Sequence, residues 1–93
     1  MKASGIVVRV LSDDLNGSHH QRFIVKVSAN KEVLVIHNID IARRIPNLKA
    51  GDKVEFSGHY IWNNQGGMVH WTHIDPHGEH NNGWIKHHGK IYQ

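Results

Sequence analysis

Short runs in which apolar residues occupy every second position dominate this chain, and they restrict it to folds built from β-strands. In Arg22–Val27, Phe23, Val25 and Val27 alternate with their neighbours. Side chains two residues apart share one face of a strand, so one face of each run meets a core and the other meets solvent or a ligand. We expect five strands, at Ile6–Leu11, Arg22–Val27, Val33–His37, Lys53–Trp62 and Met68–Asp75.

The alternation also assigns side chains to faces. In the first strand, one face carries Ile6, Val8 and Val10, and the other carries Arg9. In the fourth strand Gly58 interrupts the apolar face, at a point where a strand would bend sharply. The inward face of that strand is expected to carry Val54, Phe56, Tyr60 and Trp62.

One short helix is expected between the third and fourth strands. Asp40 is suited to cap Ile41–Ile45, and Pro46 ends the segment after little more than one turn. Three strands, a short helix and two strands follow the order of an oligonucleotide/oligosaccharide-binding (OB) barrel. An SH3-like barrel and an open sheet or sandwich are the alternatives.

The last residues are expected to add a hairpin tail to this barrel. Trp84–Gln93 contains two short apolar runs separated by His88-Gly89, a pair suited to a turn. The predicted fold is therefore mainly β, a five-stranded OB-like barrel with one short helix and a C-terminal hairpin. We expect one domain over residues 1–93, with the barrel at about 4–76 and a His/Gly-rich loop and hairpin at 77–93.

Composition limits the chemistry that the chain can perform. It has no cysteine, which excludes disulfides and thiolate zinc sites, so a metal must be held by histidine nitrogen and carboxylate oxygen. The formal net charge is +3 with histidines neutral and would be +13 with all ten protonated. This balance suits an anionic partner, either single-stranded nucleic acid or a glycan. No apolar run is long enough to cross a membrane.

The densest chemical signal is the segment His70–His80, which holds four histidines and two carboxylates in eleven residues. If the fifth strand continued to Asp75, alternate side chains would project His73, Asp75 and His77 to one side. Such a set suits a divalent metal, with zinc the first expectation. The alternative is that these are ordinary loop and surface residues. The predicted metal ligands are His73, Asp75, His77 and His80.

Several motifs together resemble one protein family. The most distinctive are His37-Asn-Ile-Asp40 and His70-Trp-Thr-His73 followed by Asp75-Pro76. The chain resembles domain-of-unknown-function family 3465 over nearly its whole length. The resemblance implies an OB-type barrel and a periplasmic or secreted setting in bacteria, without an established activity. From the residues alone we expect no export signal in this chain, which departs from that setting. Further matching segments are Gly5–Asp14, His20–Phe23, Arg44–Pro46, Gly51-Asp52, Gly66-Gly67, Gly83-Trp84 and Tyr92-Gln93.

Three function classes are consistent with these residues. The first is a small binding module with a histidine-rich site for a metal ion or an anionic ligand. The second is a metal-dependent phosphodiesterase or nuclease, in which His73, Asp75 and Arg44 would be catalytic. The third is a structural envelope protein whose histidines respond to pH. For the binding module, the expected ligand contacts are Arg22, Lys26, His37, His70 and Trp84.

Overall fold

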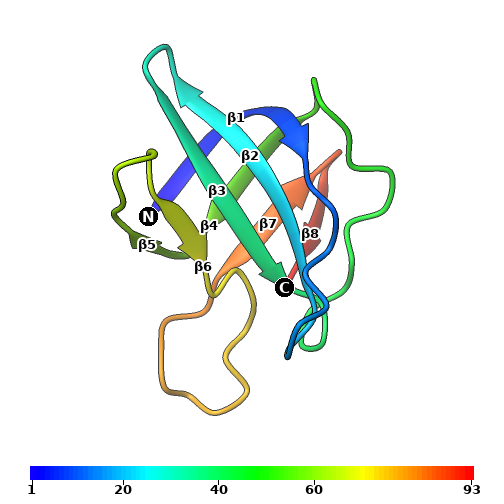
Figure 1. Cartoon of the computed structure of the whole chain (residues 1–93). Helices are drawn as coiled ribbons and strands as arrows, with labels where there is room; N and C mark the ends of the chain where they lie inside the picture. The colour runs from blue at the N-terminus through cyan, green and yellow to red at the C-terminus, as the bar shows by residue number, and fades with distance from the viewer.

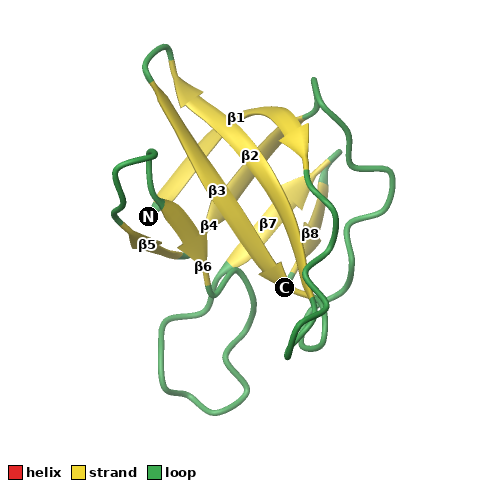
Figure 2. Ribbon diagram, viewed as in Figure 1, coloured by secondary structure: helices red, strands yellow, loops and turns green.

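The computed structural model describes all residues, 1–93, and consists of strands and loops without a helix (Figure 1, Figure 2). The mainly β prediction is confirmed. No helix is present that is long and apolar enough to cross a membrane. The strands are β1 (Lys2–Val10), β2 (His20–Ser28), β3 (Lys31–Asn38), β4 (Lys53–Ser57), β5 (His59–Ile61), β6 (Met68–His70), β7 (Trp84–His87) and β8 (Lys90–Tyr92).

All eight strands belong to one mixed sheet in the order β5-β6-β3-β2-β1-β4-β7-β8. Only the β3–β6 pair is parallel. Strands β4 and β5 are separated by Gly58 alone, yet β4 lies between β1 and β7 while β5 lies at the far edge. The sheet therefore curls strongly, so that one bent stretch of chain contributes to two distant positions in it (Figure 1). This confirms the predicted bend at Gly58.

The structure corrects the prediction of a closed five-stranded barrel, because the hydrogen-bonded sheet is open at β5 and β8. The predicted helix at Ile41–Ile45 is also wrong, since these residues form turns and irregular chain. The segment has a single helix-type bond, from Ala42 N–H to the Asn38 carbonyl. Asp40 does not cap a helix: its carboxylate accepts the backbone N–H of His19 at 3.0 Å. Because Pro46 ends this segment, too few residues remain to form further helical hydrogen bonds.

The hydrophobic core lies inside the curl of the sheet. Alternation is confirmed on β2 and β4, where Phe23, Val25, Val54 and Phe56 are all buried. On β1 it is Val7 that faces the core, while Ile6, Val8 and Val10 are partly exposed. The register of the β1–β2 pairing shifts between Val7 and Arg9, where the pairing is irregular. Trp62 does not face inward as predicted, because β5 has already ended and its side chain is 73% exposed.

Strand β6 is shorter than the predicted run to Asp75. It ends at His70, and Trp71 adopts a left-handed backbone with φ of 56°. The pleat stops there, so His73 and Asp75 leave the sheet in a long loop rather than sharing one strand face. At the other end of that loop the predicted C-terminal hairpin is confirmed: β7 pairs with β8 around a turn at His88-Gly89.

Gly58 supplies a test of the bend. A Cβ at this position would lie 2.5 Å from the His70 carbonyl oxygen and 2.8 Å from Val69 Cγ1. We expect Gly58→Ala to lower the free energy of unfolding by about 1–3 kcal/mol, because the crowded atoms include rigid backbone. Urea denaturation measures this. Ser57→Ala, one residue earlier, is the matched control and should change stability by less than about 0.5 kcal/mol. Equal stability of the two variants would contradict this account of the bend.

Candidate functional site

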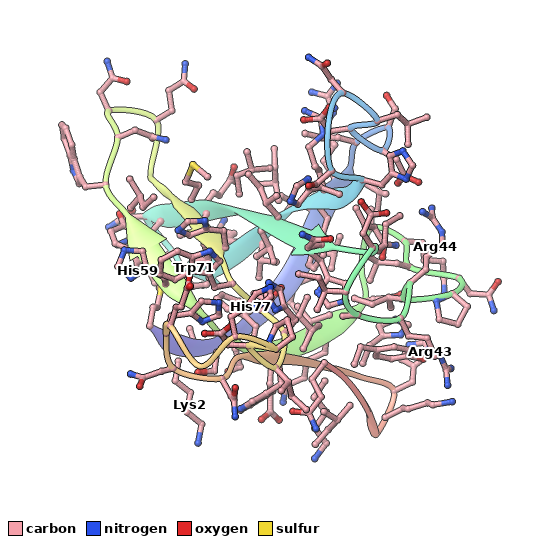
Figure 3. All side chains as sticks on the ribbon, turned by 90° about the horizontal axis from the view of Figure 1, so that it is seen from below. Lys2, Arg43, Arg44, His59, Trp71 and His77 are labelled. Carbon is pink, nitrogen blue, oxygen red and sulfur yellow. The ribbon has the colours of Figure 1, made fainter.

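A cavity of about 350 Å³ opens where β2, β3 and β6 meet the loop 71–83. We call it the histidine pocket. Figure 3 shows Trp71 and His77 on this side of the molecule, well away from Arg43 and Arg44. The chemically relevant side chains that line the pocket are His20, His70, Trp71, His73, Asp75, His77, Glu79 and His80.

The loop is organised by Asp75. Its carboxylate accepts backbone N–H groups from His77 at 2.9 Å, from His80 at 2.6 Å and from Glu79. Burial raises the pKa of Asp75, but these N–H donors, together with the nearby His80 ring, outweigh burial and hold the pKa below its ordinary value. Asp75 is therefore an ionised loop organiser, and a metal would have to compete with the backbone for it.

An aromatic stack forms one wall of the pocket. The Trp71 ring stacks with His70 at 4.6 Å and with His80 at 4.2 Å between ring centroids. His73 meets His80 edge-on at 5.4 Å, and His59 lies 5.1 Å from Trp71. A left-handed backbone is unusual for a bulky residue such as tryptophan. Strained positions of this kind are concentrated at binding and active sites, which directs attention to this wall.

Three pocket histidines share one hydrogen-bonding pattern. Nδ1 of His20 lies 3.0 Å from the Ser18 carbonyl, Nδ1 of His73 lies 2.9 Å from that of Ile74, and Nδ1 of His80 lies 2.7 Å from that of Asn81. A carbonyl oxygen only accepts, so Nδ1 carries the proton in each of these bonds, and in the neutral form of such a ring the lone pair is on Nε2. Metal-binding histidines are usually oriented by the same kind of bond from the second ring nitrogen.

His70 differs from these three. Its Nε2 is buried and makes no hydrogen bond within the protein. Burial lowers the pKa of His70, and the imidazoles around it lower the pKa further. The ring is therefore neutral near physiological pH. A buried polar atom without a partner is unfavourable by about 1–3 kcal/mol, so a ligand atom at this nitrogen would stabilise the pocket.

His37 lies beneath the pocket in the core. Its Nε2–H donates to the Arg43 carbonyl at 3.0 Å, and its Nδ1 accepts the Thr72 hydroxyl at 2.8 Å. Burial, opposed in part by the bond to Arg43, lowers the pKa of His37 to about 4. Both nitrogens are occupied, so this predicted ligand contact instead anchors β3 to the residues that follow β6.

The other predicted residues lie outside the pocket. Arg22 donates twice to the Ser12 carbonyl, and Arg44 pairs with Asp13. Trp84 is half-buried, with the Lys2 ammonium 5.7 Å from its ring. Lys26 lines a different cavity, near the loop between β5 and β6. The structure thus brings His70, His73, Asp75, His77 and His80 together, and it separates Arg44 from His73 and Asp75.

A second histidine cluster was not anticipated from the sequence. Asp52, His87 and His88 place one potential ligand atom each within 4.8 Å of one another, so the group could hold a metal. His87 Nε2–H donates to the buried Asp52 carboxylate at 2.8 Å, and the Lys49 ammonium lies 3.2 Å from it. The only sequence signal was the His87-His88 pair itself. Pairing of β4 with β7 is what carries His87 to Asp52.

The Asp52 cluster is already satisfied as an ion pair. The hydrogen bond from His87 lowers the pKa of Asp52 to about 2, against the opposing effect of burial and with help from Lys49. Each carboxylate oxygen has a positively polarised partner, whereas His70 Nε2 in the histidine pocket has none. This difference makes the pocket the stronger candidate for a ligand.

Comparison with known protein families identifies the family of this chain. The family model described as "Protein of unknown function (DUF3465)" matches residues 1–93. The chain belongs to this family. Its description assigns no activity, and neither the curated proteins nor the solved structures contain a match. The predicted resemblance is thus confirmed, and function has to be argued from the site.

The buried neutral His37 predicts a pH dependence of stability. Between about pH 6.5 and pH 4 the unfolded chain binds a proton at this residue and the folded chain does not. Stability should therefore fall as pH decreases through this window, by about 3 kcal/mol in all. Urea denaturation at a series of pH values measures it. His37→Gln should be less stable at neutral pH but have a flatter profile, whereas exposed His88→Gln should keep the wild-type slope. An unchanged slope in His37→Gln would contradict the assignment.

Asp52 predicts a separate effect at lower pH. Its folded pKa of about 2 lies below the ordinary value of 3.8, so its contribution is present above about pH 4 and is lost as pH falls toward 2. Asp52→Asn should lower the free energy of unfolding by about 1–3 kcal/mol at neutral pH and weaken the dependence between pH 4 and 2. Glu55→Gln, on the strand β4 that directly follows Asp52, is the control. Matching acid profiles for Asp52→Asn and wild type would rule out this role.

Proposed function

We propose that this protein is a small metal-binding module that takes a divalent transition-metal ion into the histidine pocket. The observation that carries the proposal is the buried, unpartnered Nε2 of His70 in a cavity that also contains His20, His73 and His80. The Nδ1–H bonds of those three rings leave Nε2 of His20 and His73 without a partner, and Nε2 of His80 lies 3.9 Å from the Asp75 carboxylate. Neutral imidazole nitrogen is the most common protein ligand for such metals.

The expected ligands are His70, His73 and His80. Their rings follow one another around Trp71, with His80 stacked on Trp71 and edge-on to His73. The nitrogens of these three rings do not all lie within 4.8 Å of one another, so the rings must rotate toward one another to bind a single metal ion. The pocket volume leaves room for this movement. His20 and His77, which also line the pocket, are further donors within reach of rotation.

The donor type selects the metal. With imidazole as the main ligand and no thiolate, affinity for divalent first-row metals is expected to rise from Mn²⁺ to Cu²⁺ and to be lower again for Zn²⁺. Magnesium and calcium prefer oxygen ligands, and the pocket's main carboxylate, Asp75, is committed to the loop backbone. We therefore expect zinc, nickel or copper rather than an alkaline-earth ion.

Two alternatives are less well supported. An anionic ligand would need imidazolium groups, but burial and the surrounding imidazoles oppose protonation of His70. A phosphodiesterase would need carboxylates and a cation gathered at the metal. Instead Asp13 pairs with Arg44, Asp40 contacts His19, and Asp75 holds the loop. Binding without turnover is the simpler chemistry for this arrangement.

The connectivity also favours a binding role. If β4 and β5 are taken as one strand bent at Gly58, the β1–β2–β3 meander, the parallel β3–β6 pair and the β1–β4 pair follow the OB order. Proteins with this connectivity commonly bind ligands beside the second and third strands. The histidine pocket lies at the end of β2 and β3. Fold alone does not establish function, so this similarity only supports the argument from the site.

Calorimetric titration of the untagged protein with Zn²⁺, Ni²⁺ and Cu²⁺ at about pH 7.5 tests the proposal. We expect one ion per chain, with His70→Ala and His80→Ala each weakening affinity about tenfold or more. Long-range ¹H–¹⁵N spectra should show the metal at Nε2 of His73 and His80 while Nδ1 keeps its proton. His19→Ala is the control, because this exposed histidine contacts Asp40 outside the pocket.

The two histidine clusters are separated by one further variant. His88→Ala removes the exposed member of the Asp52 cluster and should leave metal affinity unchanged. If His88→Ala abolishes binding and His70→Ala does not, the metal binds at Asp52 and the proposal for the pocket is wrong. Absence of binding by all three metals would also overturn it.

A further inference from the structure

Trp62 is the most exposed large apolar side chain of the molecule, at 73%. It begins the loop Trp62–Gly67, which joins β5 to β6 and contributes no residue to the histidine pocket. Beside it is a shallow cavity of about 650 Å³ between this loop and the β2–β3 turn at Ala29-Asn30. An exposed indole next to a concave surface indicates a place for a ligand.

The loop that carries Trp62 is held in one conformation. Asn63 Oδ1 accepts the backbone N–H groups of Gln65 and Gly67 at 2.9 and 2.8 Å. Tyr60 donates its hydroxyl to the Gly66 carbonyl at 3.0 Å. Gly66 and Gly67 have positive φ, and a Cβ at Gly66 would lie 2.2 Å from the Glu32 carbonyl oxygen. The loop is therefore preorganised against β3, which reduces the entropic cost of binding.

The chemistry of the cavity is that of uncharged amides around an aromatic plane. The side-chain amides of Asn30, Asn64 and Gln65 line the cavity, and none of them forms a hydrogen bond within the chain. The cations are few: Lys26, and Lys31, whose ammonium lies 4.5 Å from the Tyr60 ring centroid. The negative charge of Glu32, which also lines the cavity, offsets one of these two positive charges. Nucleic acid would require a stripe of cations along the backbone, and this cavity does not supply one.

We propose that this surface, formed by Trp62, Asn30, Asn64 and Gln65, binds a neutral oligosaccharide of β-linked pyranose units. A pyranose ring with equatorial hydroxyls presents a flat C–H face that packs on an indole. Its hydroxyls both donate and accept hydrogen bonds, as amide side chains do. The open, shallow shape suits a segment of an extended chain rather than an enclosed small molecule. This proposal rests on different residues from the metal proposal and is independent of it.

The test is titration of ¹⁵N-labelled full-length protein with three neutral sugars, cellohexaose, hexa-N-acetylchitohexaose and xylohexaose, in which the Trp62 indole N–H signal is followed. We expect at least one of them to shift this signal with a Kd between about 10 µM and 1 mM. Trp62→Ala should weaken binding about tenfold or more, and Trp62→Phe, which keeps an aromatic face, should weaken it less. Ile91→Ala, which removes another exposed apolar side chain, on β8, is the control.

Three results would overturn the proposal. The first is no shift of the Trp62 signal by any of the three sugars at about 10 mM. The second is sugar binding that Trp62→Ala leaves unchanged, because the site then lies elsewhere. The third is salt-dependent binding of a thymidine oligonucleotide at Trp62 without sugar binding, which would assign the surface to nucleic acid. Because Trp62 is exposed, its variants are expected to fold normally, and the urea midpoint checks this.

Discussion

The close approach of the chain to itself at Gly58 is the contact on which the rest of the structure depends. With no side chain at this position, the backbone passes directly beside the His70 carbonyl and the Val69 side chain. The bend lets β4 stay paired with β1 while β5 crosses to pair with β6. Strand β6 is thereby fixed parallel to β3 and ends at His70. The position of the histidine pocket thus follows from one glycine that lies outside it.

Local patterns predicted the parts of the fold that depend on alternation and turn chemistry. Strands β2 and β3, the bend at Gly58 and the final hairpin are of this kind. The buried face of strand β1 is harder to predict. Ile6–Leu11 is apolar at every position except Arg9, so the sequence does not define which face is buried. The helix was overpredicted because Asp40 has a long-range partner, the His19 backbone N–H, that no local pattern reveals.

For the candidate site, too, the sequence predicts the location but not the internal geometry. The segment His70–His80 does form most of the pocket, as its density of histidines suggested. Its internal geometry was not predictable, since the strand ends at a left-handed Trp71 for which the sequence has no signal. The Asp52 cluster escaped prediction for a different reason: its members come together through the pairing of β4 with β7, more than thirty residues apart in the chain.

The open sheet leaves two strand edges exposed, and their composition affects how copies of the protein meet. Unpaired edges are templates for pairing with other chains, the process that leads to aggregation. Here both edges, β5 and β8, are only three residues long. Strand β8 begins with Lys90, and β5 begins with His59. Short edges that begin with a charged or polar residue limit the growth of intermolecular sheet, so the curl can remain open without the protection that barrel closure gives.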